Sequence, residues 1–225
     1  MDQQPSPTSD PRITSSMEDY LKAIYRLQID GDPVTNQQLA DELGYSGASI
    51  TNMQKRLHDL NLLVLEPYKG VRLTPTGTAV ALEVIRHHRL LELFLAQTLG
   101  MDLDAVHAEA DVLEHHVSEE LETKIAAMLG FPEFDPHGDP IPAPDLTIPE
   151  LDDMPLAEAN APVVVTRVSD RNAETVRSLV ATGVLPGAII HAIDGENGSM
   201  LLTLVDNQTV AISAEQVQAV RVRAV

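Results

Sequence analysis

Between His107 and His116, side chains of types that bind metal ions recur at helical spacing. If this segment is one α-helix, His107, Asp111, Glu114 and His115 fall within a sector of about 100°. Carboxylates and imidazoles are ligands that divalent metal ions accept. The chain has no Cys, which excludes disulfides and thiolate zinc sites. A metal site on this stripe is therefore the first hypothesis.

A second pair, His88 and Glu92, lies one predicted helix earlier, at the i,i+4 spacing that lets two side chains bind one ion. An antiparallel hairpin of the two helices would bring the pairs near each other. The alternative is that these groups simply face water, which is the commoner case for any single one of them. Carboxylates with one or two imidazoles suit Mn²⁺ or Fe²⁺, although affinity alone would favour zinc or copper.

Residues 35–60 have the pattern of a helix-turn-helix. Thr35 and Gln38 form a capping signature for a short helix that stops at Gly44, and Ser46 caps a longer helix. Two predicted strands follow around the turn at 67–70, which makes the motif a winged helix-turn-helix. The alternative is a structural helical hairpin.

The start of the longer helix carries the polar side chains that we expect at a DNA groove. Lys55 and Arg56 are expected on phosphates, and few other cations lie in this helix and the wing, so non-specific affinity should be modest and depend steeply on salt. The predicted DNA-contacting residues are Gln37, Ser46, Ala48, Ser49, Thr51, Asn52, Lys55 and Arg56.

The formal net charge of −19 argues at first against nucleic acid. The acidic excess is concentrated after residue 77, where 8 Lys and Arg face 24 Asp and Glu; residues 1–77 hold 7 against 10. The polar, Pro-rich start has no signal-peptide pattern, and no apolar run approaches the ~18 residues of a membrane span. We therefore expect a cytoplasmic protein with no membrane partner.

The remaining pattern predicts a mainly α chain with a small β domain. A first helix begins at Ser15, with Glu18 completing a capping box. Long helices run from Thr74 or Thr76 to Leu99, and from Asp102 or Asp104 through Leu129. Both are apolar on more than one face, which favours dimerisation. A Pro-rich stretch follows, and the last ~65 residues read as short strands with one helix, typical of a small β-barrel.

Taken together, these segments resemble the DtxR/IdeR/MntR family of metal-dependent transcriptional regulators. The matching stretches are MEDYLKAIYRL, LADELGYSGASITNMQKRL with LTPTG after the wing, HRLLELFL, VHAEADVLEHHVSEEL and FDPHGDPIP. The composition predicts a disordered tail (1–14) and a Pro-rich linker (143–160). The resemblance implies a winged helix-turn-helix domain (15–77), a helical dimerisation and metal-binding domain (78–142) and an SH3-like, FeoA-like domain (161–225).

The resemblance also implies two ligand sets. The primary set is Asp19, Asp111, Glu114 and His115, and the ancillary set is His88, Glu92, His107 and Asp170, with Glu174 as the alternative to Asp170. Considered alone, Asp19 is only an acid in the first turn of a helix, where the helix dipole favours it. Only the resemblance promotes it to a ligand.

Two departures from the family bear on the metal. Asp19 and Asp111 stand where iron-type members have Met and Cys, so that the carboxylates look like the manganese-type members. Those members also have a second acid three residues after the first, where this chain has Lys22. That replacement argues against a binuclear site of the manganese type.

We therefore predict a homodimeric, manganese-responsive transcriptional regulator that binds an operator in double-stranded DNA when it holds metal. The resemblance implies repression of metal-uptake genes. Mn²⁺ is the expected cofactor, Fe²⁺ the alternative, and Zn²⁺, Co²⁺ or Cd²⁺ surrogates. Two competing hypotheses are a metal-dependent hydrolase, suggested by the string DVLEHH but lacking a separate general base, and a DNA-binding protein whose acids are only a solvated face.

Overall fold

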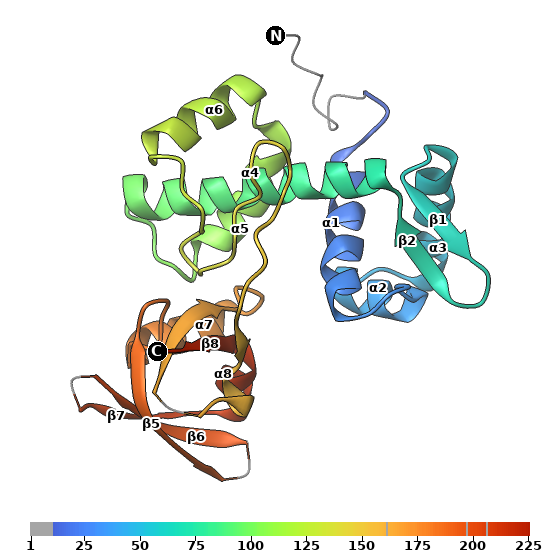
Figure 1. Cartoon of the computed structure of the whole chain (residues 1–225). Coiled ribbons are helices and arrows are strands. Elements are labelled where there is room, and N and C mark those ends of the chain that lie inside the picture. The colour runs from blue at the N-terminus through green and yellow to red at the C-terminus, as the bar shows by residue number, and fades with distance from the viewer. Residues whose placement is uncertain (1–10, 161, 197, 206) are drawn as a thin grey trace. The chain divides into compact units, whose positions relative to one another are not determined.

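The computed structural model describes residues 11–160, 162–196, 198–205 and 207–225 (Figure 1). Most of the predicted tail over 1–14 therefore lies outside the described residues. The chain divides into two compact units. The first contains the residues up to His87 with Glu114–Glu120 and Pro142–Thr147, and the second contains His88–Leu113, Leu121–Ile141 and Ile148–Val225. No helix among the described residues is long and apolar enough to cross a membrane.

The first unit contains the winged helix-turn-helix. Its elements are α1 (Ser15–Asp30), α2 (Asn36–Leu43), α3 (Gly47–Asp59), the antiparallel strands β1 (Leu63–Glu66) and β2 (Gly70–Leu73), and the first half of α4 (Pro75–Leu99). Figure 1 shows β1 and β2 as a hairpin beside α3. Their common core is aliphatic and includes Leu21, Ile24, Leu39, Ile50, Leu57, Leu62, Val71 and Val80.

Local signals set most of these boundaries. Thr35 and Gln38 form the predicted capping box of α2, and Gly44 ends that helix in the left-handed conformation that glycine adopts most easily. Ser46 caps α3 by accepting a hydrogen bond from the backbone N–H of Ser49. The predicted box at the start of α1 is wrong: the N-cap is Thr14, without a side-chain bond. The Glu18 carboxylate faces a histidine ring instead, as described below.

The second predicted long helix is also wrong in one respect. It is interrupted, because α5 (Val106–Leu113) gives way to a 3₁₀ turn (Glu114–His116) before α6 (Glu119–Met128). The turn belongs to the first unit, whereas α5 and most of α6 belong to the second. Glu114 at the break is fully buried in a pair with Lys22 of α1, and this tertiary contact outweighs local helix propensity.

The last part of the second unit is the predicted β domain. Strands β3 (Met154–Pro155), β4 (Val163–Val168), β5 (Ile189–Glu196), β6 (Ser199–Leu204), β7 (Thr209–Ile212) and β8 (Val220–Ala224) form an antiparallel sheet in the order β3-β8-β4-β5-β6-β7. A 3₁₀ turn (Leu156–Glu158) and the helices α7 (Ala173–Thr182) and α8 (Ala214–Ala219) complete it. Its core includes Leu156, Val165, Leu179, Ile190, Leu202 and Val222. The prediction of a mainly α chain with a small β domain is confirmed.

Candidate metal centres and nucleic-acid interface

The first unit brings together Asp19, Glu114 and His115, which we call the α1 cluster. Their ligand atoms lie within 4.8 Å of one another. His115 Nε2 is 3.1 Å from an Asp19 carboxylate oxygen and 3.5 Å from Glu114 Oε1. His115 Nδ1 lies 2.5 Å from the carboxylate of Glu18, 97 residues away in the chain. Glu114 is buried, whereas His115 and Asp19 are of intermediate burial, with Asp19 the more open to solvent.

The carboxylates around His115 favour the protonated form of its ring. Burial opposes the charged imidazole, but hydrogen bonds to Asp19 and Glu18 and the charge of Glu114 outweigh it and raise the pKa of His115 to about 10. A proton on this ring therefore stabilises the surrounding carboxylates. A divalent cation would do the same with more charge, so the donor set fits a metal of the oxygen-and-imidazole type.

Asp111, the fourth predicted primary ligand, belongs to the second unit. There its carboxylate lies 3.3 Å from His88 Nδ1 and 3.5 Å from His107 Nε2. His107 and Asp111 keep the predicted i,i+4 relation on α5, but the turn at Glu114–His116 ends the helix before the other two residues of the stripe. The idea of four ligands on one continuous helix is therefore wrong, although three primary residues do meet.

The second unit assembles all four predicted ancillary residues, His88, Glu92, His107 and Asp170, which we call the histidine cluster. Glu92 Oε1 lies 3.1 Å from both His88 Nε2 and His107 Nδ1. His107 Nδ1 is also 3.1 Å from Asp170, which comes from the β domain. The alternative residue, Glu174, is exposed in the first turn of α7 and belongs to none of the metal-type clusters among the described residues.

Charge compensation is strong in the histidine cluster. Burial would raise the pKa of Glu92, but the rings of His107, His137 and His88, which lie against its carboxylate, hold it well below its usual range. Burial likewise opposes protonation of His107, yet its bonds to Asp170 and Glu92 raise its pKa to about 10. The cluster is thus a set of acids and imidazoles, two buried and two of intermediate burial, that retains protons in place of another cation.

Sequence reasoning missed two residues beside this cluster, Asp135 and His137. With Glu92 they form a fully buried group, which we call the inner cluster. Glu92 Oε2, Asp135 Oδ2 and His137 Nδ1 have no hydrogen-bond partner among the described residues, and Glu92 Oε2 is 3.6 Å from His137 Nδ1. Buried polar atoms without partners are costly, so three that converge fit a bound cation.

The inner cluster is built by a tight loop. Asp135 Oδ1 accepts the backbone N–H groups of His137 and Asp139, which directs its other oxygen toward the cluster. His137 Nε2 lies 3.1 Å from the carbonyl of Leu103, and a ring that donates there leaves Nδ1 to bind a metal ion once its own proton is lost. Gly138, with φ of +90°, lets the loop approach β4 so closely that a Cβ would meet the Thr166 carbonyl at 2.1 Å. The Asp-x-His spacing inside FDPHGDPIP was the available signal.

All eight predicted DNA-contacting side chains are exposed in the first unit. The Thr51 hydroxyl donates to the Gly47 carbonyl within α3 and lies 3.4 Å from the amide nitrogen of Asn36 at the start of α2. Asn36 in turn accepts a hydrogen bond from the buried amide of Gln54. This polar network, absent from the sequence-based hypothesis, fixes α3 on α2.

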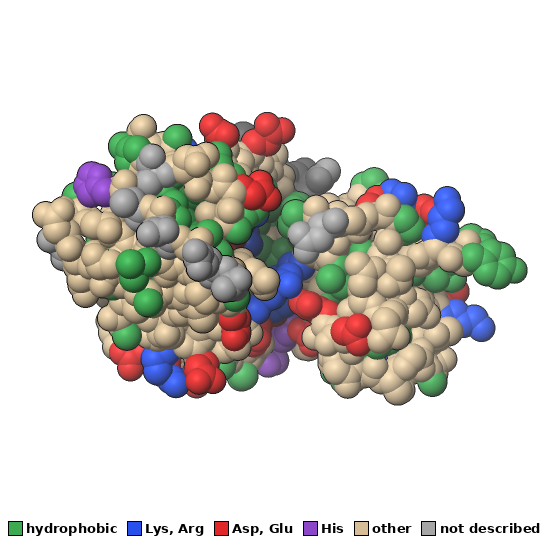
Figure 2. Space-filling view, turned by 90° about the horizontal axis from the view of Figure 1, so that it is seen from below, with side chains coloured by type: hydrophobic (Ala, Val, Ile, Leu, Met, Phe, Trp, Pro, Cys, Tyr) green, Lys and Arg blue, Asp and Glu red, His purple; other side chains and the backbone are tan. Residues whose placement is uncertain are grey.

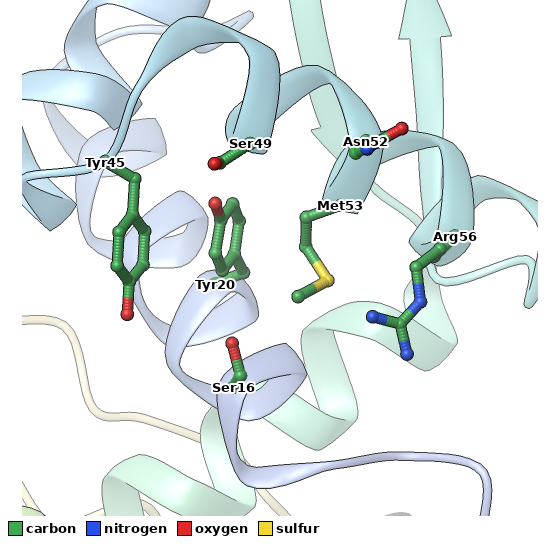
Figure 3. Close-up of a pocket in the computed structure, with 7 residues that line it drawn as sticks. All are labelled: Ser16, Tyr20, Tyr45, Ser49, Asn52, Met53 and Arg56. Atoms are coloured by element: carbon green, nitrogen blue, oxygen red, sulfur yellow. The ribbon is translucent and has the colours of Figure 1, made fainter.

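A hollow of about 560 Å³ lies between α1 and α3 (Figure 3). It is lined by Ser16, Tyr20, Tyr45, Ser49, Asn52, Met53 and Arg56. The rings of Tyr20 and Tyr45 are stacked with centroids 5.8 Å apart, and burial together with the Tyr45 charge raises the pKa of Tyr20. Helix α1 therefore supplies residues to the α1 cluster and, through Tyr20, also contacts Tyr45 in the turn before α3.

Three protein-family profiles match consecutive parts of the chain. Residues 12–71 match the N-terminal DNA-binding domain of iron-dependent repressors, residues 74–143 match their metal-binding and dimerisation domain, and residues 154–224 match the FeoA domain. The chain is 28% identical over 227 residues to the iron-dependent repressor IdeR of Mycobacterium tuberculosis, covering 95% of this chain and 99% of that protein. It is 32% identical over 158 residues to the diphtheria toxin repressor of Corynebacterium diphtheriae, covering 70% and 67%.

Solved structures of repressors superpose on this chain over nearly its whole length. A manganese-dependent transcriptional repressor in complex with manganese superposes with a TM-score of 0.84 at 33% identity, over 93% of this chain and all of that one. The repressor ScaR with bound Zn²⁺ gives 0.79 at 30% identity, over 93% and 99%. From its three matched domains and these full-length similarities, the chain belongs to the DtxR/IdeR/MntR family of metal-dependent transcriptional repressors.

Proposed function

We propose that this protein is a manganese-responsive repressor that binds operator DNA as a homodimer when its clusters hold Mn²⁺. The observation that carries the proposal is that Asp19, Glu114 and His115 come together in the same compact unit as the winged helix-turn-helix. A ligand that binds this cluster better in the DNA-competent conformation raises DNA affinity by linkage. The family is one of regulators, which sets the hydrolase hypothesis aside.

The choice of manganese rests on the donors. The α1 cluster offers carboxylates and one imidazole, with no sulfur, and such sets suit Mn²⁺ better than soft metals. Bound there, a divalent cation would supply positive charge to buried acids. We propose Asp111 as a further primary ligand, as the resemblance implies, and the histidine cluster with Asp135 and His137 as the second metal-binding region. Iron remains the alternative, since iron-dependent relatives are similar over 95% of this chain.

The proposed recognition helix is α3. Ser46, Ser49 and Asn52 are exposed at or near its N-terminus, and Lys55 and Arg56 follow. On the face shown in Figure 2, acidic side chains form several separate groups with a few Lys and Arg side chains between them. Because few cations are available to contact phosphates, we expect DNA affinity to depend on two copies of α3 and on contacts from hydroxyls and backbone N–H groups.

The dimerisation surface is proposed in the second unit. Large apolar side chains are exposed between residues 99 and 134, at Leu99, Val112, Leu113, Leu121, Met128, Phe131 and Phe134. Exposed apolar side chains in this number usually mark a protein interface. Two-fold symmetry would then present two α3 helices to successive turns of the major groove.

The test starts from metal-free protein and a random duplex library. Selection with Mn²⁺ should yield a palindromic site, and titration of Mn²⁺ against Fe²⁺ should show which ion raises affinity for that site at its cellular concentration. Asp111→Ala should weaken the metal response. Affinity that is unchanged by either ion would support a constitutive DNA-binding protein instead, and a full response in Asp111→Ala would remove this residue from the primary site.

A further inference from the structure

We propose that Lys22 is a tethered cation of the α1 cluster, which competes with the metal for Glu114 and limits the cluster to one divalent ion. The proposal rests on the proposed metal binding at Asp19, Glu114 and His115. It goes beyond that binding, because it assigns a role to a side chain that is not a metal ligand.

The geometry is that of a buried ion pair. Lys22 Nζ lies 2.5 Å from Glu114 Oε1, and the two side chains are only 8% and 0% exposed. Lys22 follows Asp19 by three residues on α1, so both side chains lie on the same side of the helix. The pair spans 92 residues of sequence and joins α1 to the turn that interrupts the predicted long helix.

The charges explain a limit of one ion. Three carboxylates, those of Glu18, Asp19 and Glu114, surround His115, and the ammonium of Lys22 is paired with one of them, Glu114. With His115 neutral, as a metal ligand must be, these four charged groups and the proposed ligand Asp111 leave three negative charges, of which a single divalent ion neutralises two. A second divalent ion would leave a buried excess of positive charge, which is strongly unfavourable.

The same pair has opposite effects on the two states of the protein. Without metal, Lys22 compensates the buried Glu114 carboxylate and holds the turn on α1. With metal, the ammonium occupies an oxygen of a ligand and repels the incoming ion at short range. Removing the ammonium should therefore destabilise the metal-free protein and strengthen metal binding, a combination that a merely structural lysine would not produce.

The decisive variant is Lys22→Met in the full-length protein, which keeps the length of the side chain and removes its charge. We expect the Tm of the chelator-treated protein to fall by roughly 10 °C, as for a buried charge left without its partner. We expect the Kd for Mn²⁺, measured from the free-ion EPR signal, to tighten at least about tenfold. Lys124→Met, an exposed lysine on α6, is the control and should change neither value.

Further variants keep the result interpretable. Lys22→Arg retains the charge and should keep the Kd within about threefold of the wild-type value, even if Lys22→Met folds only with metal. Lys22→Glu should add one Mn²⁺ per protomer. A lower Tm with an unchanged or weaker Kd in Lys22→Met would make Lys22 a structural residue and overturn the proposal. If Asp19→Asn leaves the Mn²⁺ stoichiometry of the wild type unchanged, the proposed metal site itself fails, whatever Lys22 does.

Discussion

The α1 cluster and the histidine cluster use similar residue types in different settings. The α1 cluster joins segments more than 90 residues apart, has one imidazole and contains a lysine in its charge balance. The histidine cluster has two imidazoles around the fully buried Glu92, a third in the adjoining inner cluster, and an acid from the β domain. The first is adjacent to the DNA-binding elements and the second ties the helical region to the β domain within the second unit.

This difference separates two roles that a metal can have. We propose that an ion in the α1 cluster would be sensed, because Tyr20 of α1 stacks on Tyr45, next to the start of α3 (Figure 3). An ion in the histidine cluster is positioned to stabilise, because its ligands hold Asp170 of the β domain against α5. Three predictions test this division, from the largest expected effect to the smallest.

Removing one imidazole from each cluster should separate the roles most clearly. His115→Ala should reduce the Mn²⁺-dependent gain in DNA affinity by about 100-fold, near the upper end of typical allosteric coupling. His88→Ala should reduce it by about tenfold or less, because His88 lies outside the unit that holds the winged helix-turn-helix. Fluorescence anisotropy of a labelled operator with and without Mn²⁺ measures both. A larger loss in His88→Ala would break the proposed division.

Substitutions in the inner cluster should affect Mn²⁺ binding in the second unit and leave Mn²⁺ binding at the α1 cluster unchanged. His137→Ala should weaken Mn²⁺ binding there by roughly 10–100-fold, as for loss of a ligand or its supporting group. The measurement is calorimetric titration in an Asp19→Asn background, where the α1 cluster is disabled. His191→Ala in the β domain, an exposed histidine on β5, is the matched control. Equal affinity in the two variants would show that the three partnerless atoms do not bind the ion.

The prediction with the smallest effect on DNA binding is a pH dependence of the stability of the metal-free protein. Its folded state raises the pKa of His115 and His107 to about 10 and that of His137 to about 9, above the ordinary value of 6.5. The folded state therefore binds more protons than the unfolded state between about pH 6.5 and 10. This stabilisation is fully present below pH 6.5 and is lost as the pH rises toward 10.

Urea unfolding in chelator at pH 6.5, 7.5, 8.5 and 9.5 should accordingly give a falling free energy of unfolding. Mn²⁺ affinity should rise over the same range, because the ion no longer competes with protons. His115→Gln and His107→Gln each remove one of these groups, and the variant with the flatter profile identifies the cluster that dominates. A free energy of unfolding that rises with pH would contradict the assigned protonation.

Local signals were sufficient for the winged helix-turn-helix. Capping at Thr35 and Ser46, the glycine stop at Gly44 and the apolar spacing of α3 are properties of short segments, so they could be recognised from the chain alone. The i,i+4 pairs His88/Glu92 on α4 and His107/Asp111 on α5 could also be recognised from the chain alone. Because neighbouring turns of a helix place such side chains together in any fold, the histidine cluster was predictable in its helical part.

Contacts between distant segments were not predictable in this way. At the helix break, Glu114 pairs with Lys22 of another helix. The Glu18 carboxylate does not cap α1, because it pairs with the His115 ring, 97 residues away in the chain. Asp135 and His137 were missed because a Pro-rich loop has no periodicity to show where its side chains point.

By itself, the sequence determined the kinds of ligand, the helices that carry them and the DNA-binding motif, since these follow from residue types and short spacings. Only the tertiary structure decided which acids meet which histidines, and that a lysine pairs with a carboxylate of the predicted metal site. Buried charges must find partners wherever the folded chain brings them within a few ångströms. That choice depends on packing between segments about ninety residues apart.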